Sequence, residues 1–244
     1  MRRRTPDVPY AAGVVLAGGS GTRMGAGMNK AYLPLAGRRL ASWSLLTFGQ
    51  VPEVGVLVLV ARPEDAEHLD LVLSSDLPGT QVELVHGGDT RQDSELAALR
   101  HLSDRVDDGT IDVILLHDAA RPLVRPALVT EVVEAAREHG GAVPGLPAED
   151  LVTGAGTTVS GAPLEGAVRA QTPQGFRAAA LVDAYEQAAR EGFLGTDTAS
   201  CMERYSSLPV RWVRGDEHNF KITYPHDLTV AERLLDTSVV RQPW

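Results

Sequence analysis

Apolar, β-branched runs alternate with helix-like segments along most of this chain, and that alternation constrains the fold more than any other feature. Val54–Val60, for example, is apolar at nearly every position, which is typical of a strand covered on both faces of a sheet. Strands that alternate with helices predict crossover units and therefore a parallel sheet. The expected strands are Gly13–Ala17, Val54–Val60, Gln81–Val85, Ile111–Leu116 and Val210–Val213.

Helical patterns occupy the intervals between these runs. Pro126–His139 is the clearest, because a proline starts it and two glycines, Gly140 and Gly141, follow as a stop signal. We predict an α/β fold in which a doubly wound, mainly parallel sheet carries helices on both faces, within one domain over residues 1–244. The expected helices are Leu40–Phe48, Glu64–Leu73, Ser94–Leu102, Pro126–His139, Arg177–Glu191 and Pro225–Leu235.

Residues 144–170 break this pattern. They are rich in Gly, Ala, Thr and Pro, with short β-prone pieces such as Thr157–Val159. Either a β-hairpin arm projects from the sheet here or the segment is a disordered insert; the arm is favoured, because long structureless loops are uncommon in compact domains. The segment is also too apolar to remain uncovered, so we expect a homodimer with this arm in the interface.

Composition limits the classes of protein to which the chain can belong. A net charge of -9 argues against a general nucleic-acid coat, and no run is long and apolar enough to cross a membrane. The single cysteine, Cys201, excludes an intramolecular disulfide and is expected to be a small buried hydrophobe. Three arginines open the chain with no apolar stretch behind them, so we expect no signal peptide and a cytoplasmic location.

Chemistry is first indicated where the opening apolar run ends in a glycine-rich turn. Glycines let the backbone approach a ligand closely, and successive N–H groups in such a turn can bind an anion. Arg23 and Lys30 add positive charge beside it, so the turn predicts a polyphosphate ligand. A Rossmann fingerprint does not fit, because Met24 stands where its third glycine belongs, and the Gly-Lys-Ser/Thr of a P-loop is missing. A plain strand-to-helix turn is the remaining alternative.

A second informative segment, residues 115–122, follows a buried strand. Ligands bind at the carboxyl edge of open α/β sheets, which is where Asp118 and Arg121 fall. Asp118 can hold Mg²⁺ or accept hydroxyl protons, and Arg121 can clamp a phosphate. The alternative is a salt-bridged pair on a loop. His117 is expected to be structural, because no nucleophile is adjacent in sequence.

A third segment, residues 86–94, also lies between a strand and a helix. Gly87 and Gly88 permit close backbone contact with a flat base, and polar side chains follow that can contact base or phosphate. Those side chains are Asp89, Arg91 and Ser94. Capping of the helix by Asp93 or Ser94 is an equal alternative.

Three later segments are less specific when taken alone. Residues 171–176 read as a Pro/Gly turn, and Thr196–Ser200 as a helix N-cap. Asn219–Thr223 places Lys221 in a β-prone run, where a lone lysine is usually solvated.

Taken in order, these segments resemble the cytidylyltransferases of the 2-C-methyl-D-erythritol 4-phosphate pathway of isoprenoid precursor synthesis. The matching motifs are A-G-G-x-G-x-R-M with a following N-K, G-G-D-x-R-x-D-S, H-D-A-A-R-P, Q-T-P-Q-G-F, T-D-x-A-S and N-x-K-I-T-x-P-x-D-L. The first motif alone fits any sugar or polyol nucleotidyltransferase. The resemblance implies a nucleotide-diphospho-sugar transferase-like fold, CTP and a polyol phosphate as substrates, Mg²⁺ as cofactor, and a dimer that exchanges its arms.

The resemblance also implies a role for each matching residue. The nucleotide is contacted by Leu16, Ala17, Gly18, Gly19, Ser20, Gly21, Gly88, Asp89, Arg91, Ser94 and Ala119. The polyol phosphate is held by Asp118, Arg121, Thr196 and Lys221. The catalytic cations are Arg23, Lys30 and Lys221, of which the first two stabilise the pentacovalent α-phosphate. Asp118 is the candidate metal ligand.

The chain departs from the family pattern in the arm. Leu151 and Leu164 stand where the family offers a hydroxyl and a guanidinium, and Arg169 is a possible substitute. The H-D-A-A-R-P and T-D-x-A-S segments match the methylerythritol phosphate branch best, so methylerythritol phosphate is the expected acceptor. The altered arm keeps ribitol 5-phosphate, or another polyol phosphate or phosphonate, as the alternative. A non-catalytic nucleotide-binding regulator is the alternative of another class. Arg23 and Lys30 argue against it, because ground-state binding does not need transition-state cations.

Overall fold

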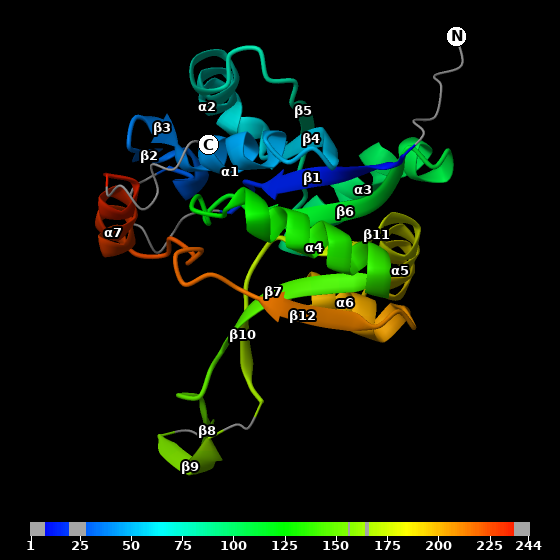
Figure 1. The fold of residues 1–244 in the computed structure, drawn as a ribbon, viewed down its shortest axis with the longest axis vertical. Coiled ribbons are helices and arrows are strands. Elements are labelled where there is room, and N and C mark those ends of the chain that lie inside the picture. The colour runs from blue at the N-terminus through cyan, green and yellow to red at the C-terminus, as the bar shows by residue number, and fades with distance from the viewer. Residues whose placement is uncertain (1–7, 20–27, 156, 164–165, 237–244) are drawn as a thin grey trace.

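One mixed sheet of eight strands forms the centre of the molecule (Figure 1). The computed structural model describes residues 8–19, 28–155, 157–163 and 166–236. Seven strands follow the order β10-β7-β11-β6-β1-β4-β5, and β12 pairs with β7 beside that path. The strands are β1 (Tyr10–Leu16), β4 (Val54–Ala61), β5 (Glu83–His86), β6 (Ile111–Asp118), β7 (Gly141–Pro147), β10 (Val168–Ala170), β11 (Gln174–Arg177) and β12 (Val210–Arg214).

The contiguous strands β5, β4, β1 and β6 run parallel, as the crossover pattern predicts. The strands β10 and β11 run antiparallel to their neighbours, and β12 runs parallel to β7. The expectation of a doubly wound, mainly parallel α/β sheet is confirmed. The parallel half is the part that matters for a ligand, because its strand ends share one edge of the sheet.

Helices cover both faces of this sheet. The helices are α1 (Leu40–Gly49), α2 (Ala66–Leu71), α3 (Arg91–Asp107), α4 (Pro126–His139), α5 (Ala178–Glu191), α6 (Thr198–Tyr205) and α7 (Pro225–Asp236). Ala11 and Val15 of β1 pack into the core that contains α1 and α4 residues, whereas Ala12 and Val14 pack with α3, α5 and α6. This is the two-residue alternation of a strand buried on both sides. Gly13 has a packing reason, since a Cβ there would lie 2.3 Å from the Phe48 ring.

The arm projects away from the body of the molecule (Figure 1). At its end, β8 (Val152–Ala155) and β9 (Thr158–Pro163) form a separate antiparallel hairpin. The β-hairpin interpretation of residues 144–170 is thus confirmed over the disordered insert. The first part of this segment belongs to the main sheet, because β7 continues to Pro147.

Several expected boundaries were wrong, for local reasons. The helix expected at Glu64–Leu73 is a 3-10 turn (Pro63–Asp65), then α2, then a π turn (Val72–Asp76). The strand expected at Gln81–Val85 begins at Glu83, and the one expected at Gly13–Ala17 begins at Tyr10. The run around Lys221 is not a strand, because its backbone turns between β12 and α7.

The caps of α3 and α6 test the sequence reading closely. Thr90 caps α3, and Asp93 completes a reciprocal capping box with it, so Ser94 is not the cap. Asp197 caps α6 as the T-D-x-A-S segment indicates, with Ser200 as its partner.

Cys201 is buried in the core, as expected. Among the described residues, the helices are all too short or too polar to cross a membrane.

Candidate active site

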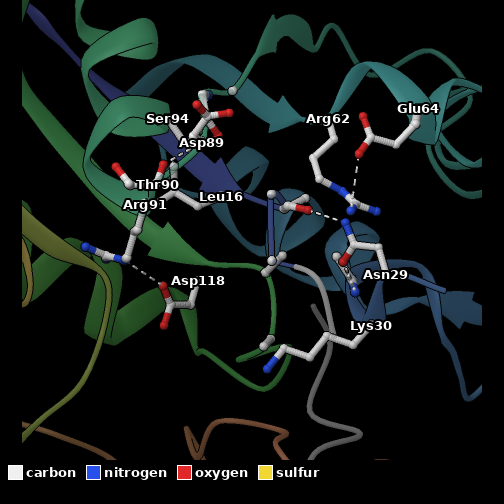
Figure 2. Close-up of a pocket in the computed structure, with 18 of the residues that line it drawn as sticks. Leu16, Asn29, Lys30, Arg62, Glu64, Asp89, Thr90, Arg91, Ser94 and Asp118 are labelled. Carbon is white, nitrogen blue, oxygen red and sulfur yellow. Dashed lines mark hydrogen bonds and ion pairs between the residues drawn. The ribbon is translucent and has the colours of Figure 1, made fainter. Parts of the chain in front are cut away.

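A cavity of about 680 Å³ opens at the carboxyl ends of β1, β4, β5 and β6 (Figure 2). Each of these strand ends contributes a short loop to its wall, as expected at the ligand-binding edge of a parallel sheet. A 3-10 turn (Lys30–Tyr32) and the segment before α7 complete the described lining. Six segments that are separate in sequence therefore meet in one site.

Most of the residues singled out in the sequence lie on this cavity. They are Leu16, Ala17, Gly18, Gly19, Lys30, Gly88, Asp89, Arg91, Ser94, Asp118, Ala119 and Lys221. Ser20, Gly21 and Arg23 fall outside the described residues. Of the predicted residues that the structure does describe, Arg121 and Thr196 are not part of the lining.

The glycine segment is described over residues 16–19. Its first two residues, Leu16 and Ala17, are fixed by hydrogen bonds from three directions. Ala17 N donates to Val60 O (2.8 Å), and Leu16 O accepts from Ala119 N (3.1 Å). The Asn29 amide donates to Ala17 O and to Asp65 Oδ2, the latter at 2.8 Å. Asn29 is buried, and its two hydrogen bonds connect this segment to the turn after β4. The sequence reading noted the N-K pair but gave Asn29 no role.

The Asp65 carboxylate, which accepts a hydrogen bond from Asn29, also pairs with Arg62. Arg62 donates to Asp65 Oδ1 at 2.8 Å and lines the cavity, with Glu64 Oε1 3.3 Å from its Nη1. Lys30 lies next to Asn29 and donates from Nζ to Ile222 O at 3.1 Å. This contact joins the 3-10 turn to the segment that carries Lys221.

The turn after β5 is packed tightly against the start of α3. Ser94 Oγ accepts from Gly88 N (3.2 Å) and donates to Thr90 O (3.0 Å). A Cβ on Gly88 would lie 2.4 Å from the Asp93 Cβ. The double glycine therefore has a structural reason as well as the predicted one, and Ser94 holds the turn instead of capping the helix.

Asp118 lies between two cations at the end of β6. Lys221 Nζ is 2.7 Å from Oδ2, and Arg91 Nε is 3.4 Å from Oδ1. Burial alone would raise the pKa of Asp118, but Arg91 and Lys221 outweigh it and hold that pKa well below its ordinary value. Lys221 remains partly exposed to solvent, and this ion pair holds its amine at the cavity.

His117 is structural, as expected. Asp118 N donates to Thr172 Oγ1 (3.0 Å), so the hydroxyl is free to donate to His117 Nδ1 at 3.1 Å. His117 Nε2 then donates to Arg121 O at 3.1 Å, which fixes the neutral ring. Burial lowers the pKa of His117 to about 4.

Arg121 and Thr196 lie away from the described cavity wall. Arg121 Nη1 donates to Asn219 O (2.8 Å), and its buried Nε has no hydrogen-bond partner among the described residues. Burial lowers the pKa of this guanidinium. Thr196 is exposed, whereas Thr198 is buried and bonds to Glu95 (2.8 Å).

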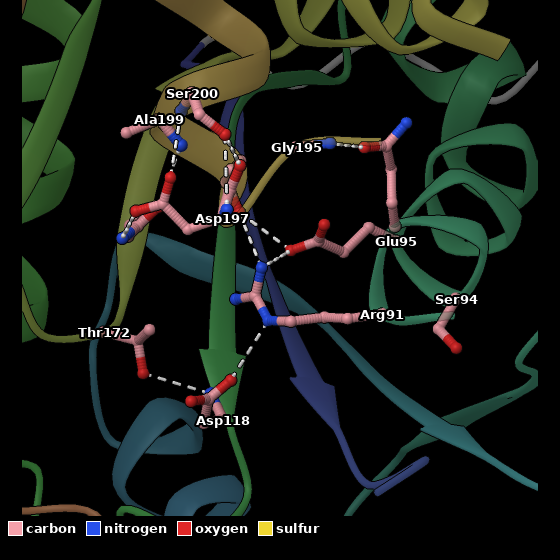
Figure 3. Close-up of polar contacts among 12 residues, drawn as sticks. Arg91, Ser94, Glu95, Asp118, Thr172, Gly195, Asp197, Ala199 and Ser200 are labelled. Carbon is pink, nitrogen blue, oxygen red and sulfur yellow. Dashed lines mark hydrogen bonds and ion pairs between the residues drawn. The ribbon is translucent and has the colours of Figure 1, made fainter. Parts of the chain in front are cut away.

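Glu95 and its partners are the functional-site contacts that sequence reasoning missed (Figure 3). Arg91 Nη1 is 2.5 Å from Glu95 Oε1, behind the cavity wall. A glutamate on the buried face of a helix, four residues after Arg91, was a signal, but its other partners, Tyr185 and Thr198, come from distant helices. Thr172, interpreted as part of a plain turn, likewise turns out to bond the Asp118 backbone.

A mainly parallel sheet with a glycine segment, the Lys30 turn and a cation-paired aspartate at its carboxyl edge defines a nucleotidyltransferase of the α/β type. The family model described as 2-C-methyl-D-erythritol 4-phosphate cytidylyltransferase (IspD) matches residues 11–237. The chain belongs to this family of enzymes.

Individual relatives agree with this assignment. The chain is 38% identical over 229 residues to the 2-C-methyl-D-erythritol 4-phosphate cytidylyltransferase of Acidobacterium capsulatum, covering 89% of this chain and 94% of that one. It is 42% identical over 229 residues to the bifunctional enzyme IspD/IspF of Dinoroseobacter shibae, covering 93% of this chain but 54% of that longer protein.

Solved structures share the fold. The 2-C-methyl-D-erythritol 4-phosphate cytidylyltransferase of Thermus thermophilus superposes with a TM-score of 0.70 at 31% identity, over 92% of this chain and 98% of that one. The 4-diphosphocytidyl-2C-methyl-D-erythritol synthase of Anaerococcus prevotii reaches 0.79 at 24% identity, over 94% and 99%.

Proposed function

We propose that this chain transfers a cytidylyl group from CTP to 2-C-methyl-D-erythritol 4-phosphate and releases pyrophosphate. The observation that carries the proposal is one cavity that joins the glycine segment, Lys30, the Gly87–Gly88 turn and the Asp118–Lys221 pair. The glycine segment and the double-glycine turn form the nucleotide side. The Asp118–Lys221 pair forms the acceptor side.

The reaction is an attack by an acceptor phosphate oxygen on the α-phosphorus of CTP. That oxygen forms the new P–O bond while the bond to the departing pyrophosphate breaks. A phosphate monoester is already ionised at neutral pH, so the reaction needs no general base. The buried, neutral His117 therefore has no role as a base. Rate enhancement then comes from alignment and from cations placed where charge develops. Lys30, together with Arg23, is assigned to the α-phosphate.

Asp118 acts by orienting cations and not by taking a proton. Its depressed pKa keeps the carboxylate ionised, so it holds Lys221 in place for the acceptor phosphate. Arg121, whose buried Nε lacks a partner among the described residues, is assigned to the same phosphate. We also assign Thr196 to the acceptor; it precedes α6 and does not line the described cavity.

Nucleotidyl transfer from a triphosphate uses a divalent metal, and we assign Mg²⁺ to this role. Asp118 is an ionised carboxylate at the cavity, of the kind that Mg²⁺ prefers, and its two oxygens also face Lys221 and Arg91. Within the described ranges, His, Cys, Asp and Glu side chains do not gather in threes, so the triphosphate oxygens would carry most of the coordination. The ion would draw charge toward the leaving pyrophosphate.

We also place a homodimer and a cytoplasmic location in this proposal. The arm exposes Leu151 and Val152, which supports a covered position against a second copy. Arg169 on the arm pairs with Asp150 at 3.3 Å and stays exposed, so it is available to a partner's acceptor site. A buried, unpaired Cys201 is consistent with a reducing compartment.

The test is pyrophosphate release from CTP with three acceptors side by side: methylerythritol, erythritol and ribitol phosphates. We expect methylerythritol phosphate to have the highest kcat/KM. If it ranks below either competitor by about tenfold, equivalent to roughly 1.4 kcal/mol, the acceptor assignment fails and the cytidylyltransferase class remains. If CTP releases pyrophosphate with none of the acceptors, the transfer reaction itself is refuted.

A further inference from the structure

Glu95 is a carboxylate in the first turns of α3, 1% exposed and behind the wall of the cavity. It does not line the described cavity, and the reaction as derived above gives it no task. A buried carboxylate is costly unless its charge is paired and its lone pairs are used. Its contacts therefore indicate what it does.

The contacts of Glu95 come from three helices. Its Oε1 pairs with Arg91 Nη1 (2.5 Å) and accepts from Thr198 Oγ1 of α6 (2.8 Å). Its Oε2 accepts from Tyr185 OH of α5 at 2.7 Å. Burial raises the pKa of Glu95, and Arg91 opposes that rise. Each carboxylate oxygen is thus held by groups that α5 and α6 fix in the core.

Arg91 carries this arrangement into the cavity. Its Nη1 faces Glu95, while its Nε faces Asp118 Oδ1 at 3.4 Å (Figure 3). The other oxygen of Asp118 pairs with Lys221 at 2.7 Å. A continuous chain of polar contacts therefore runs from the buried helices to the amine on the acceptor side.

We propose that Glu95, held by Tyr185 and Thr198, is a positioning residue that sets the direction of the Arg91 guanidinium and thereby preserves the Asp118–Lys221 pair. The proposal rests on the proposed function, because it requires the acceptor phosphate to bind at that pair. Guanidinium groups prefer bidentate contact with a carboxylate. With its Nη1 held by Glu95, Arg91 offers Asp118 a single donor and leaves the second oxygen to Lys221.

The matched experiment compares Glu95→Gln with Asp76→Asn. Asp76 is a second buried carboxylate, paired with Arg39 (2.6 Å) and accepting from Ser42 (2.7 Å), away from the described cavity lining. Glu95→Gln should raise the KM for the acceptor roughly tenfold and the KM for CTP by a clearly smaller factor, because Arg91 is also a predicted nucleotide contact. Asp76→Asn should lower Tm and leave both KM values unchanged. If both variants lower Tm and neither changes the KM for the acceptor, Glu95 is merely structural and the proposal is overturned.

A double-mutant cycle separates action through Arg91 from independent damage. If Glu95 acts through Arg91, Glu95→Gln should cost little further activity in an Arg91→Ala background, whereas additive losses would contradict the proposal. Tyr185→Phe, which removes one O–H donor, repeats the measurement if Glu95→Gln fails to fold, and should also raise the acceptor KM selectively. Wild-type turnover is measured first, so loss of the proposed function itself appears as an inactive wild type and not as a changed KM ratio.

Discussion

Lys221 is the residue whose environment most changes its interpretation. Alone in its segment it reads as a solvated cation, but the 2.7 Å pair with Asp118 holds it at the cavity that the turn after β5 also lines. Its partner, and not its own position in the sequence, brings it to the proposed site. The same holds for Asp118, whose carboxylate is ionised because Arg91 and Lys221 face it.

Replacing Lys221 should therefore impair the acceptor more than the nucleotide. Lys221→Met removes the charged contact while keeping the length of the side chain, and kcat/KM for the acceptor should fall by about 10–100-fold, or roughly 1.5–3 kcal/mol. The Kd of CTP, measured by calorimetry, should change by less than about threefold, or 0.65 kcal/mol or so. Lys221→Arg serves as the charge-preserving control. Equal losses for both substrates would show that Lys221 does not distinguish them.

His117 predicts how stability depends on pH. Its folded-state pKa of about 4 lies below the ordinary value of 6.5. Between these two pH values, His117 is protonated in the unfolded chain but neutral in the folded protein. The stabilisation is complete above pH 6.5 and is lost as pH falls toward 4, by about 3 kcal/mol in total.

Urea unfolding at pH 7 and pH 4 checks this. The wild type should lose more free energy of unfolding between the two values than His117→Gln does, by about 3 kcal/mol, since glutamine cannot titrate. Because the neutral ring takes no part in the proposed transfer, kcat of the wild type should show no inflection near pH 6.5 that the variant lacks. Identical losses in both proteins would mean that His117 is not buried as a neutral group.

At the scale of elements, the turn between β5 and α3 shows how a binding surface depends on helix packing. Gly88 lies against Asp93, a member of the capping box that starts α3. Gly88→Ala should displace the turn and raise the KM for CTP by roughly tenfold, with about 1–3 kcal/mol of destabilisation. Gly49→Ala is the matched control, because its added Cβ meets only Leu57 at an ordinary 3.5 Å. A normal KM for CTP in Gly88→Ala would separate this turn from nucleotide binding.

The elements also show what sequence can predict. Val54–Val60 was found because a strand buried on both faces is apolar throughout, and β4 indeed spans Val54–Ala61. The strand β7, Gly-Ala-Val-Pro-Gly-Leu-Pro, was missed because its prolines and glycines mimic a loop. Its strand character comes from pairing with β10, β11 and β12, which is a tertiary effect.

The site divides in the same way. Residues inside contiguous motifs, such as Gly88, Asp89 and Asp118, were found because strand ends concentrate them at one edge. Asn29 and Glu95 were missed, since their partners lie on segments that only the packed fold brings together. Periodicity shows that a helix face is buried, but it cannot show which distant side chain receives a buried carboxylate.

For the whole molecule, the arm raises the question of whether a single chain contains a complete site. The hairpin of β8 and β9 projects away from the main sheet (Figure 1). Arg169 of β10 is exposed beside Asp150. If the arm serves a partner's acceptor site, Arg169→Ala should raise the acceptor KM while the KM for CTP stays constant.

Sedimentation should show a dimer at micromolar concentration, and Leu151→Glu should weaken that dimer.

Complementation between two defective chains decides whether the arm acts on its own chain or on a partner. Co-expressed Lys30→Ala and Arg169→Ala chains, carrying different tags, give mixed dimers that can be purified. If the arm acts on the partner, one site of each mixed dimer carries both defects and the other carries neither, so about half of wild-type activity returns at low acceptor concentration. If the arm acts on its own site, both sites keep one defect and activity stays at the level of the parents. A monomer with full activity would remove the arm from the reaction altogether.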